Sequence, residues 1–491
     1  MFPYFCFMKY IIFLITFIFL VSCTDEPTTK ITQLTKKKEN VMLIFGKRSY
    51  KKDTLYSSNG ISYSISLLPN ISYIDQYPYE RQPIKPNNIT KNDTIIVPTN
   101  SQIVLEHMYH YFYTSSYLLK AGDTIQFEYQ DDAPYATMLN NKKLTNELNF
   151  EVSYNMANNI YISDSEFYDE HKRHRTNQEH KAYLKILKDN RIKQLTSLDS
   201  IHNKIDFNTD YYNLLKNKLK YTISLMDFSG IKHEEIELRN DTLLATPIYK
   251  YFLPNYVWQR FEIPFIKRRN IPMYDPLIRF DSVQKSDLFS EKIQNYLLYS
   301  SLEEIAKYYP LDDFKTYHKK FTETVKDTTL LNIINNRYLT DFISFKGKTD
   351  EVYLINSKKE KTTLKEAIEQ HKGKVVYVDF WASWCAPCRV AMKPAKELQL
   401  AYENKDFVYI YISIDQDFSK WQVASKEENL EFYRYNYVAV NYPRAEFYRQ
   451  LELKTIPRYI MYDKEGNMID KDAPSTKETE IEELINTYLK K

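Results

Sequence analysis

Two cysteines separated by two residues, Cys385 and Cys388, constrain the possible folds of this chain more than any other feature. They follow Val375–Phe380, a run that is apolar except for Asp379, as expected of a parallel strand buried on both faces. If a helix starts at the pair, the first sulfur lies at the positive end of the helix dipole, which stabilises a thiolate. Pro387 suits a first helical turn because its φ angle is fixed and it has no amide hydrogen. We therefore predict a redox-active dithiol.

Metal binding and a purely structural disulfide are the alternatives for this pair. A structural zinc site needs four ligands, and the sequence has no second cysteine pair. His171, His174 and His180 fall on or near one predicted helix, but their Lys and Arg neighbours would repel a cation. A structural disulfide stays open in an oxidising compartment, although so short a loop gains little stability from closure. We expect no metal and no cofactor.

From about Lys346 onward, predicted strands and helices alternate along the chain. Strands are expected at Val352–Ile355, Val375–Phe380, Phe407–Ile414 and Arg458–Tyr462. Helices are expected from a capping box at Thr363–Glu366 to Gly373, over Cys388–Asn404, near Trp421–Asn429 and from Thr476. Such alternation is typical of an α/β domain, which we place at residues 346–491.

Two motifs in this domain resemble those of the TlpA/ResA-like thiol-disulfide oxidoreductases of the thioredoxin superfamily. Residues Val378–Cys388 (Val-Asp-Phe-Trp-Ala-Ser-Trp-Cys-Ala-Pro-Cys) match the active-site strand and loop of that family nearly throughout. Thr455–Pro457 (Thr-Ile-Pro) matches the segment that carries its cis-proline. The resemblance covers about 30% of the chain and implies a thioredoxin fold with disulfide reductase or interchange activity.

The resemblance also implies catalytic roles. Cys385 would be the exposed nucleophile that attacks a substrate disulfide and forms a mixed disulfide. Cys388, more buried, would attack Cys385 and release the reduced substrate. Asp379 lies six residues before Cys385 on the buried strand, so a raised pKa would let it accept the Cys388 proton.

A substrate-binding surface is implied around the two sulfurs. Pro457, in its cis form, would face the disulfide, and Ile456 would offer backbone hydrogen bonds to an extended substrate segment. Trp384, Ala386 and Pro387 would complete this surface.

Two positions depart from the family pattern. Ala391 stands where many members carry Glu, and Pro394 comes one position later than their helix proline. Both bear on the redox potential and not on the chemistry. A thiol peroxidase of the same fold is an alternative, but its sites place Thr three residues before the reactive cysteine, where this chain has Ala382. A surface lipoprotein that binds a partner and carries an accessory redox domain is another alternative.

An apolar run near the start of the chain predicts export. Tyr10–Val21 is short for a bilayer crossing and typical of a signal-peptide core. It ends in Leu-Val-Ser-Cys23, which resembles the lipobox of bacterial lipoproteins and implies cleavage after residue 22 and a lipid on Cys23. We expect a lipid-anchored protein of the cell envelope that faces the periplasm or lies on the outer-membrane surface. An uncleaved N-terminal anchor is the alternative.

Between the leader and the α/β domain, composition predicts three further segments. Residues 23–40 are polar and expected to be a flexible tether. Residues 41–160 carry short β-branched and aromatic runs and predict an all-β, sandwich-like domain. Its Leu118–Asp123 segment resembles the domain that precedes thioredoxin modules in some envelope lipoproteins. Residues 161–345 are predicted to be helical.

Charge and composition limit the partners. Lys and Arg total 67 against 64 Asp and Glu, so no global basic field is available for nucleic acid. We expect disulfide-containing envelope proteins as substrates, a separate redox partner, and membrane contact through the lipid on Cys23. The 44 tyrosines are interpreted as compositional bias, with an aromatic binding surface as the alternative.

Overall fold

The computed structural model describes residues 39–47, 53–56, 62–65, 71–75, 77–78, 80–84, 92–99, 101–109, 113–131, 133–141, 145–158, 177–204, 206–226, 236–268 and 271–491. The predicted leader, Cys23, His171 and His174 lie outside these residues, and so does most of the predicted tether. The last two tether positions, Glu39 and Asn40, instead belong to the first strand, where they pair with Thr99 and Pro98.

Strands dominate the N-terminal part of the described chain. They are β1 (Glu39–Phe45), β2 (Asp53–Tyr56), β3 (Ser62–Ile65), β4 (Ile71–Ile74), β5 (Gln82–Ile84), β6 (Asp93–Thr99), β7 (Gln102–Tyr109), β8 (Tyr113–Lys120), β9 (Thr124–Gln130) and β10 (Ala133–Met138). Two four-stranded sheets have the orders β10-β9-β1-β6 and β5-β4-β7-β8, and β2 pairs with β3. Only β1 and β9 run parallel among the neighbours in these two sheets.

The two sheets share one core because alternate residues of their strands face inward. Val41 and Leu43 of β1 lie in the same buried cluster as Ile103 and Leu105 of β7. Gly122, with φ +95°, forms the turn between β8 and β9, a conformation that favours glycine.

Helices complete this core, so the all-β expectation for residues 41–160 is incomplete. They are α1 (Thr145–Leu148), α2 (Phe150–Ala157), α4 (Asn177–His202) and α5 (Thr209–Met226). Leu198 of α4 and Leu215 of α5 are buried in the cluster formed by the strands. Tyr211 of α5 donates a hydrogen bond to the Ser116 carbonyl at 2.7 Å. The change in composition at residues 160/161 therefore does not mark a boundary between two cores.

A second core lies in the middle of the chain. Its elements are η4 (Asp241–Ala245), α6 (Pro247–Arg260), β11 (Phe265–Arg268), β12 (Ile271–Tyr274), α7 (Pro276–Gln284), α8 (Glu291–Tyr308), α9 (Leu311–Thr324), α10 (Thr328–Arg337), η5 (Thr340–Phe342) and α11 (Ile343–Lys346). Side chains of Asp275, Ser290 and Asp327 cap α7, α8 and α10 at their N-termini. The β11–β12 hairpin is an exception to the predicted helical character.

The C-terminal part forms a seven-stranded sheet with helices. Its elements are β13 (Tyr353–Ile355), β14 (Lys361–Thr363), α12 (Leu364–Glu369), β15 (Val375–Trp381), α13 (Ala386–Ala401), β16 (Phe407–Ser413), α14 (Phe418–Glu427), β17 (Asn436–Ala439), α15 (Glu446–Gln450), β18 (Arg458–Tyr462), β19 (Met468–Asp470) and α16 (Glu480–Leu489). The strand order is β14-β13-β17-β16-β15-β18-β19. Strand β16 runs parallel to both β15 and β17, and β15 is buried along its whole length, as its apolar sequence predicted. The predicted capping box at Thr363 and Glu366 is present.

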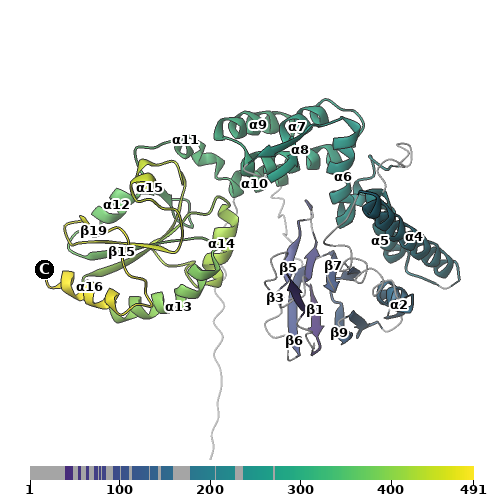
Figure 1. The fold of residues 1–491 in the computed structure, drawn as a ribbon, viewed down its shortest axis with the longest axis horizontal. Helices are drawn as coiled ribbons and strands as arrows, with labels where there is room; N and C mark the ends of the chain where they lie inside the picture. The colour runs from purple at the N-terminus through teal and green to yellow at the C-terminus, as the bar shows by residue number, and fades with distance from the viewer. Residues whose placement is uncertain are drawn as a thin grey trace, which may run out of the picture.

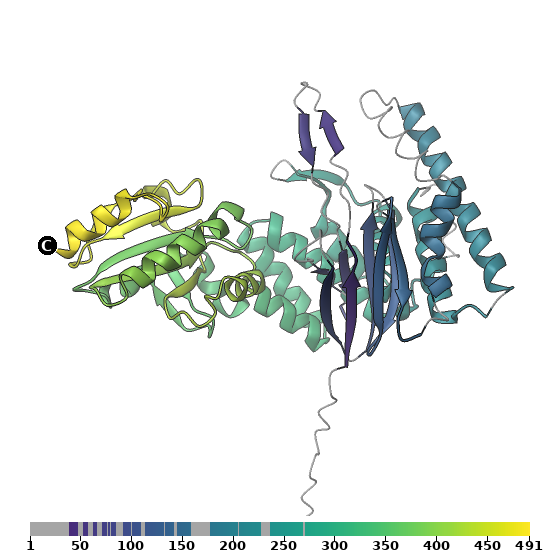
Figure 2. The same ribbon diagram turned by 90° about the horizontal axis from the view of Figure 1, so that it is seen from below.

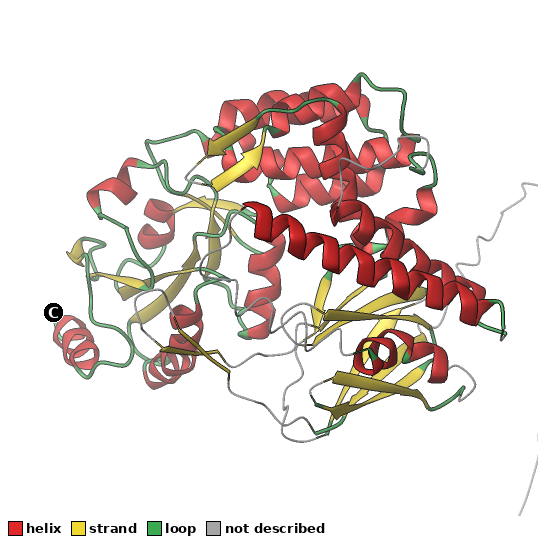
Figure 3. Ribbon diagram, turned by 45° about the vertical axis from the view of Figure 1, so that its right-hand side comes forward, coloured by secondary structure: helices red, strands yellow, loops and turns green. Residues whose placement is uncertain are grey.

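The three parts are arranged around the middle helices. Helices α7 to α9 lie above the N-terminal sheets in Figure 1, and α10 lies nearer to the C-terminal part. Helices α4 and α5 run beside the N-terminal sheets, as the view from below shows (Figure 2). In Figure 3 most helices gather across the top, with the two strand-rich parts below them. Among the described residues, no helix has the length and apolarity needed to cross a membrane.

Arg337 at the end of α10 joins all three parts. Its guanidinium contacts Glu80 of the N-terminal part at 2.7 Å and Glu303 of α8. The Nε atom lies 3.6 Å from Asp417, which caps α14 in the C-terminal part. The Arg337 side chain is only 15% exposed, so these contacts are less screened by water than surface ion pairs.

We predict that Arg337→Met lowers the stability of the protein by on the order of 2 kcal/mol, because three carboxylates lose a shared, poorly hydrated cation. Urea denaturation followed by circular dichroism measures the change. Lys319→Met is the control, since the exposed Lys319 side chain pairs with Glu323 one helical turn away at 3.9 Å. Equal midpoints for the two variants would show that the Arg337 contacts contribute no more than a surface pair.

Candidate active site

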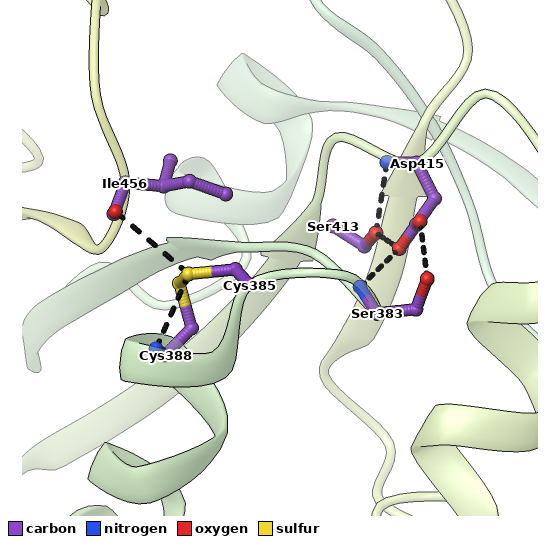
Figure 4. Close-up of a disulfide and its surroundings, with 6 residues drawn as sticks. All are labelled: Ser383, Cys385, Cys388, Ser413, Asp415 and Ile456. Atoms are coloured by element: carbon purple, nitrogen blue, oxygen red, sulfur yellow. Dashed lines mark hydrogen bonds between the residues drawn. A yellow bond between two sulfur atoms is a disulfide. The ribbon is translucent and has the colours of Figure 1, made fainter. Parts of the chain in front are cut away.

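Cys385 and Cys388 form a disulfide, with their Cα atoms 5.3 Å apart (Figure 4). They lie where β15 passes into α13, as the sequence predicted. The helix begins at Ala386, two residues before the predicted start, because Cys385 itself is the N-cap. Its sulfur accepts a hydrogen bond from the backbone N–H of Cys388 at 3.2 Å. Pro387 occupies the first turn of the helix, where no amide hydrogen is needed.

The disulfide is largely covered in this oxidised form. Cys385 is 4% exposed and Cys388 is 2% exposed. Cys388 is therefore the more buried of the two, as predicted, but Cys385 is buried as well and not exposed as expected. Both side chains belong to the buried cluster of the C-terminal part. Trp384, Ala386 and Pro387 are exposed beside them, and Trp384 is 66% exposed.

A cis-proline segment borders the sulfurs. The Ile456–Pro457 peptide bond is cis, as the family resemblance implied. The Ile456 carbonyl oxygen lies 3.7 Å from the Cys385 sulfur, so this segment faces the disulfide (Figure 4). Ile456 and Pro457 are half-buried, which leaves part of the segment accessible.

Asp379 is a buried acid on β15. It is 2% exposed, and its Oδ2 accepts a hydrogen bond from the Tyr409 hydroxyl at 3.0 Å. Its Oδ1 has no hydrogen-bond partner among the described residues. Burial raises the pKa of Asp379 to about 7, and the Tyr409 hydrogen bond opposes this rise. The predicted raised pKa thus has burial as its cause.

Four tyrosines create the apolar surroundings of this acid. Tyr411 of β16 and Tyr459 of β18 stand opposite Asp379 in the register of the sheet. The rings of Tyr377 and Tyr409 lie 5.1 Å apart, and Tyr409 and Tyr411 lie 4.5 Å apart. Burial raises the pKa of Tyr409 well above its ordinary value, so this residue acts as a neutral hydrogen-bond donor. Part of the tyrosine excess therefore has a defined place in the core, which composition alone did not indicate.

Asp415 contacts the active-site loop and was missed in the sequence. It follows β16 and is 5% exposed. Its carboxylate accepts hydrogen bonds from the Ser383 backbone N–H at 2.8 Å and the Ser383 hydroxyl at 2.7 Å (Figure 4). The available signal was its position just after a buried strand, because neighbouring parallel strands end at the same edge of a sheet.

No metal site is evident in the described residues. They contain no group of three or more His, Cys, Asp or Glu side chains that could hold a metal ion. The side chain of His180 is not described, and His171 and His174 fall outside the structure's described residues.

Comparisons with known proteins agree on the C-terminal part. A thioredoxin-like family model matches residues 373–468. Thiol-disulfide oxidoreductase ResA of Bacillus thuringiensis is 28% identical over 124 residues, which cover 25% of this chain and 66% of that relative. Thioredoxin of Mycoplasmoides gallisepticum is 27% identical over 113 residues, covering 23% of this chain and 83% of that relative. A solved thiol-disulfide oxidoreductase from Bacteroides fragilis is 26% identical with a TM-score of 0.24, covering 28% of this chain and 98% of that structure.

The chain therefore carries a thioredoxin-like fold at its C-terminus, with thiol-disulfide oxidoreductases among its homologues. The match covers slightly less than two thirds of the ResA relative. Residues 1–372 lie outside the family model.

We predict that Asp379→Asn stabilises the protein at pH 8 by up to about 4 kcal/mol and has little effect at pH 4. The folded protein holds the Asp379 proton more tightly than the unfolded chain, so wild-type stability falls as the pH rises from about 4 to about 7. Urea denaturation of the oxidised proteins at several pH values measures the difference. A difference that stays constant over this range would show that Asp379 has ordinary acidity.

Proposed function

We propose that this protein is a thiol-disulfide oxidoreductase that reduces or exchanges disulfides of cell-envelope proteins. The observation that carries the proposal is the Cys385–Cys388 disulfide at the N-terminus of α13, opposite the cis-proline segment. A purely structural disulfide would need neither an exposed rim formed by Trp384, Ala386 and Pro387 nor the Ile456 carbonyl facing its sulfur.

The reaction starts from the reduced pair. The Cys385 thiolate attacks one sulfur of a substrate disulfide, forms a mixed disulfide and releases the other substrate sulfur as a thiolate. Cys388, after losing its proton, attacks the Cys385 sulfur and releases the second substrate thiolate. The substrate gains two electrons, the protein ends in the disulfide form described above, and a separate dithiol donor must reduce it again.

Helix and backbone geometry favour the thiolate at Cys385. In the disulfide form its sulfur accepts the Cys388 N–H, which is also aligned with the positive end of α13. The same donor is available when the sulfur carries a negative charge, and charge-assisted hydrogen bonds are about twice as strong as neutral ones. This contact lowers the cost of both forming the nucleophile and expelling it as a leaving group.

Asp379 is the proposed acceptor of the Cys388 proton. An acid with a pKa of about 7 is present in both protonation states near neutral pH, so it can accept a proton and later return it. We assign the transfer to its Oδ1, which has no hydrogen-bond partner among the described residues.

The exposed rim forms the proposed substrate surface. Trp384, Ala386 and Pro387 supply apolar contact area beside the sulfurs. Ile456 supplies backbone groups that an extended substrate segment can pair with, next to cis-Pro457. Such contacts would be made to the main chain and apolar groups of a substrate, which many proteins share, so this surface suits a range of protein disulfides.

With dithiothreitol as the electron donor, Cys385→Ser and Cys388→Ser are expected to lower the rate of insulin disulfide reduction to that of dithiothreitol alone. After reduction and removal of dithiothreitol, Cys388→Ser keeps the nucleophile and should accumulate a mixed disulfide between Cys385 and an insulin chain, a bond that Cys385→Ser cannot form. Turbidity measures activity, and non-reducing electrophoresis detects the adduct. Equal activity of the wild type and both variants would reject the assignment.

The envelope location is proposed from the lipobox-like segment. After cleavage behind residue 22, a diacylglycerol on the Cys23 sulfur would hold the protein at a membrane, with the redox site facing the periplasm or the cell exterior. Oxidising compartments of this kind are where protein disulfides persist.

In a bacterial host, Cys23→Ser is expected to abolish incorporation of labelled palmitate and shift the protein out of the detergent phase, because the acylated sulfur is lost. Cys6→Ser is the matched control, since Cys6 precedes the proposed cleavage site and should keep full labelling. Labelling of the Cys23→Ser variant at the wild-type level would refute the proposed anchor.

A further inference from the structure

Asp415 is a buried acid for which the proposed reaction gives no role. Its carboxylate accepts three hydrogen bonds: two from Ser383, through the backbone N–H and the hydroxyl, and one from the Ser413 hydroxyl at 2.6 Å. All three donors are neutral groups. Burying a carboxylate is costly, and neutral donors compensate this cost less well than a cation would. Two exposed serines could hold a loop by hydrogen bonds without the cost of burying a carboxylate.

The three bonds restrain the active-site loop at one residue. Ser383 lies between the end of β15 and the N-cap Cys385, and both of its donors are held by the same carboxylate (Figure 4). Two bonds to one residue fix its orientation as well as its position. The Asp415 N–H in turn donates to the Ser413 hydroxyl at 3.0 Å, so the acceptor is itself fixed to the end of β16.

The placement of the Cys385 sulfur depends on this loop. The sulfur lies 3.2 Å from the Cys388 nitrogen and 3.7 Å from the Ile456 oxygen, one on each side (Figure 4). A shift of the loop by about 1 Å would break the first contact, because hydrogen bonds weaken steeply with distance and angle. In the reduced protein no covalent bond joins Cys385 to Cys388, so the loop must hold the sulfur by other means.

We propose that Asp415 is a positioning residue that holds Ser383, and through it the Cys385 sulfur, against the Cys388 amide in the reduced protein. This inference rests on the proposed thiol-disulfide oxidoreductase function and deepens it. Asp415 touches no reacting atom and acts through Ser383.

Positioning and simple charge repulsion make opposite predictions. If Asp415 acts by position, its removal loosens the loop, weakens the N–H···S⁻ hydrogen bond and raises the pKa of the Cys385 thiol. If Asp415 acts by its charge, its removal takes a negative group away from the thiolate and lowers that pKa. The direction of the change therefore separates the two.

The test uses full-length protein in which Cys388→Ser leaves Cys385 as the reporter thiol, together with Asp415→Asn, Asp415→Ala or Ser383→Ala. The pH profile of alkylation by iodoacetamide gives the pKa of Cys385, and urea midpoints report stability separately. Asp417→Asn is the matched control, because it removes a carboxylate two residues away while Asn still caps α14.

Asp415→Ala is expected to raise the pKa by about one unit, which lowers the thiolate fraction near neutral pH by up to about tenfold. Ser383→Ala keeps the backbone bond to Asp415 and should give a smaller rise. Asp415→Asn keeps one acceptor oxygen and should partly rescue the Ala variant. Asp417→Asn should leave the pKa of Cys385 at the parent value, while its urea midpoint is expected to fall because Asp417 also contacts Arg337. With Cys388 restored, insulin reduction at pH 7 should fall in the same order.

Three results would overturn the proposal. A lower pKa in both Asp415 variants would assign the effect to charge, an unchanged pKa with a reduced urea midpoint would leave a structural role only, and a rise of equal size in Asp417→Asn would remove the specificity for Asp415. If Asp415→Ala fails to fold, Asp415→Asn and Ser383→Ala carry the same test. The alkylation readout does not require enzymatic activity, so absence of insulin reduction in the wild type would reject the proposed function without deciding this one.

Discussion

The hydrogen bond from the Cys388 amide to the Cys385 sulfur is the interaction on which the proposed chemistry depends. It exists because a fully buried strand, β15, delivers the chain to the first turn of α13, where backbone N–H groups have no helical partner. The sulfur takes the place that a serine or aspartate oxygen has in an ordinary helix cap. In the proposed reaction, a contact that normally caps the start of a helix therefore stabilises a charged sulfur.

The same sheet supplies two buried acids with different surroundings. Asp379 lies among tyrosine rings with one hydrogen bond, and burial raises its pKa to about 7. Asp415 accepts three hydrogen bonds at the end of the neighbouring strand. One carboxyl group is therefore suited to exchanging a proton, while the other contacts the active-site loop through the hydrogen bonds that it accepts.

Sequence reasoning located the site but not all of its support. Cys385, Cys388 and Asp379 were predictable from a buried strand that leads into a helix start, and the cis-proline segment was predictable only from its resemblance to a family motif. Asp415 was not, because its contact with Ser383 depends on which strand lies next to β15, and strand order is set by packing over the whole domain. The same reason explains the strand-rich part: α4 and α5 look like independent charged helices, and only the sheets they cover show which core they complete.

The junction at Arg337 joins the part that carries the dithiol to the rest of the described chain. One guanidinium ties the end of α10 to the N-terminal strands through Glu80 and to the α14 cap through Asp417. The part that carries the dithiol is thereby tied to the other two parts through one shared cation. In the proposed reaction, the surface that a folded substrate approaches would therefore belong to a three-part protein and not to an isolated thioredoxin-like domain.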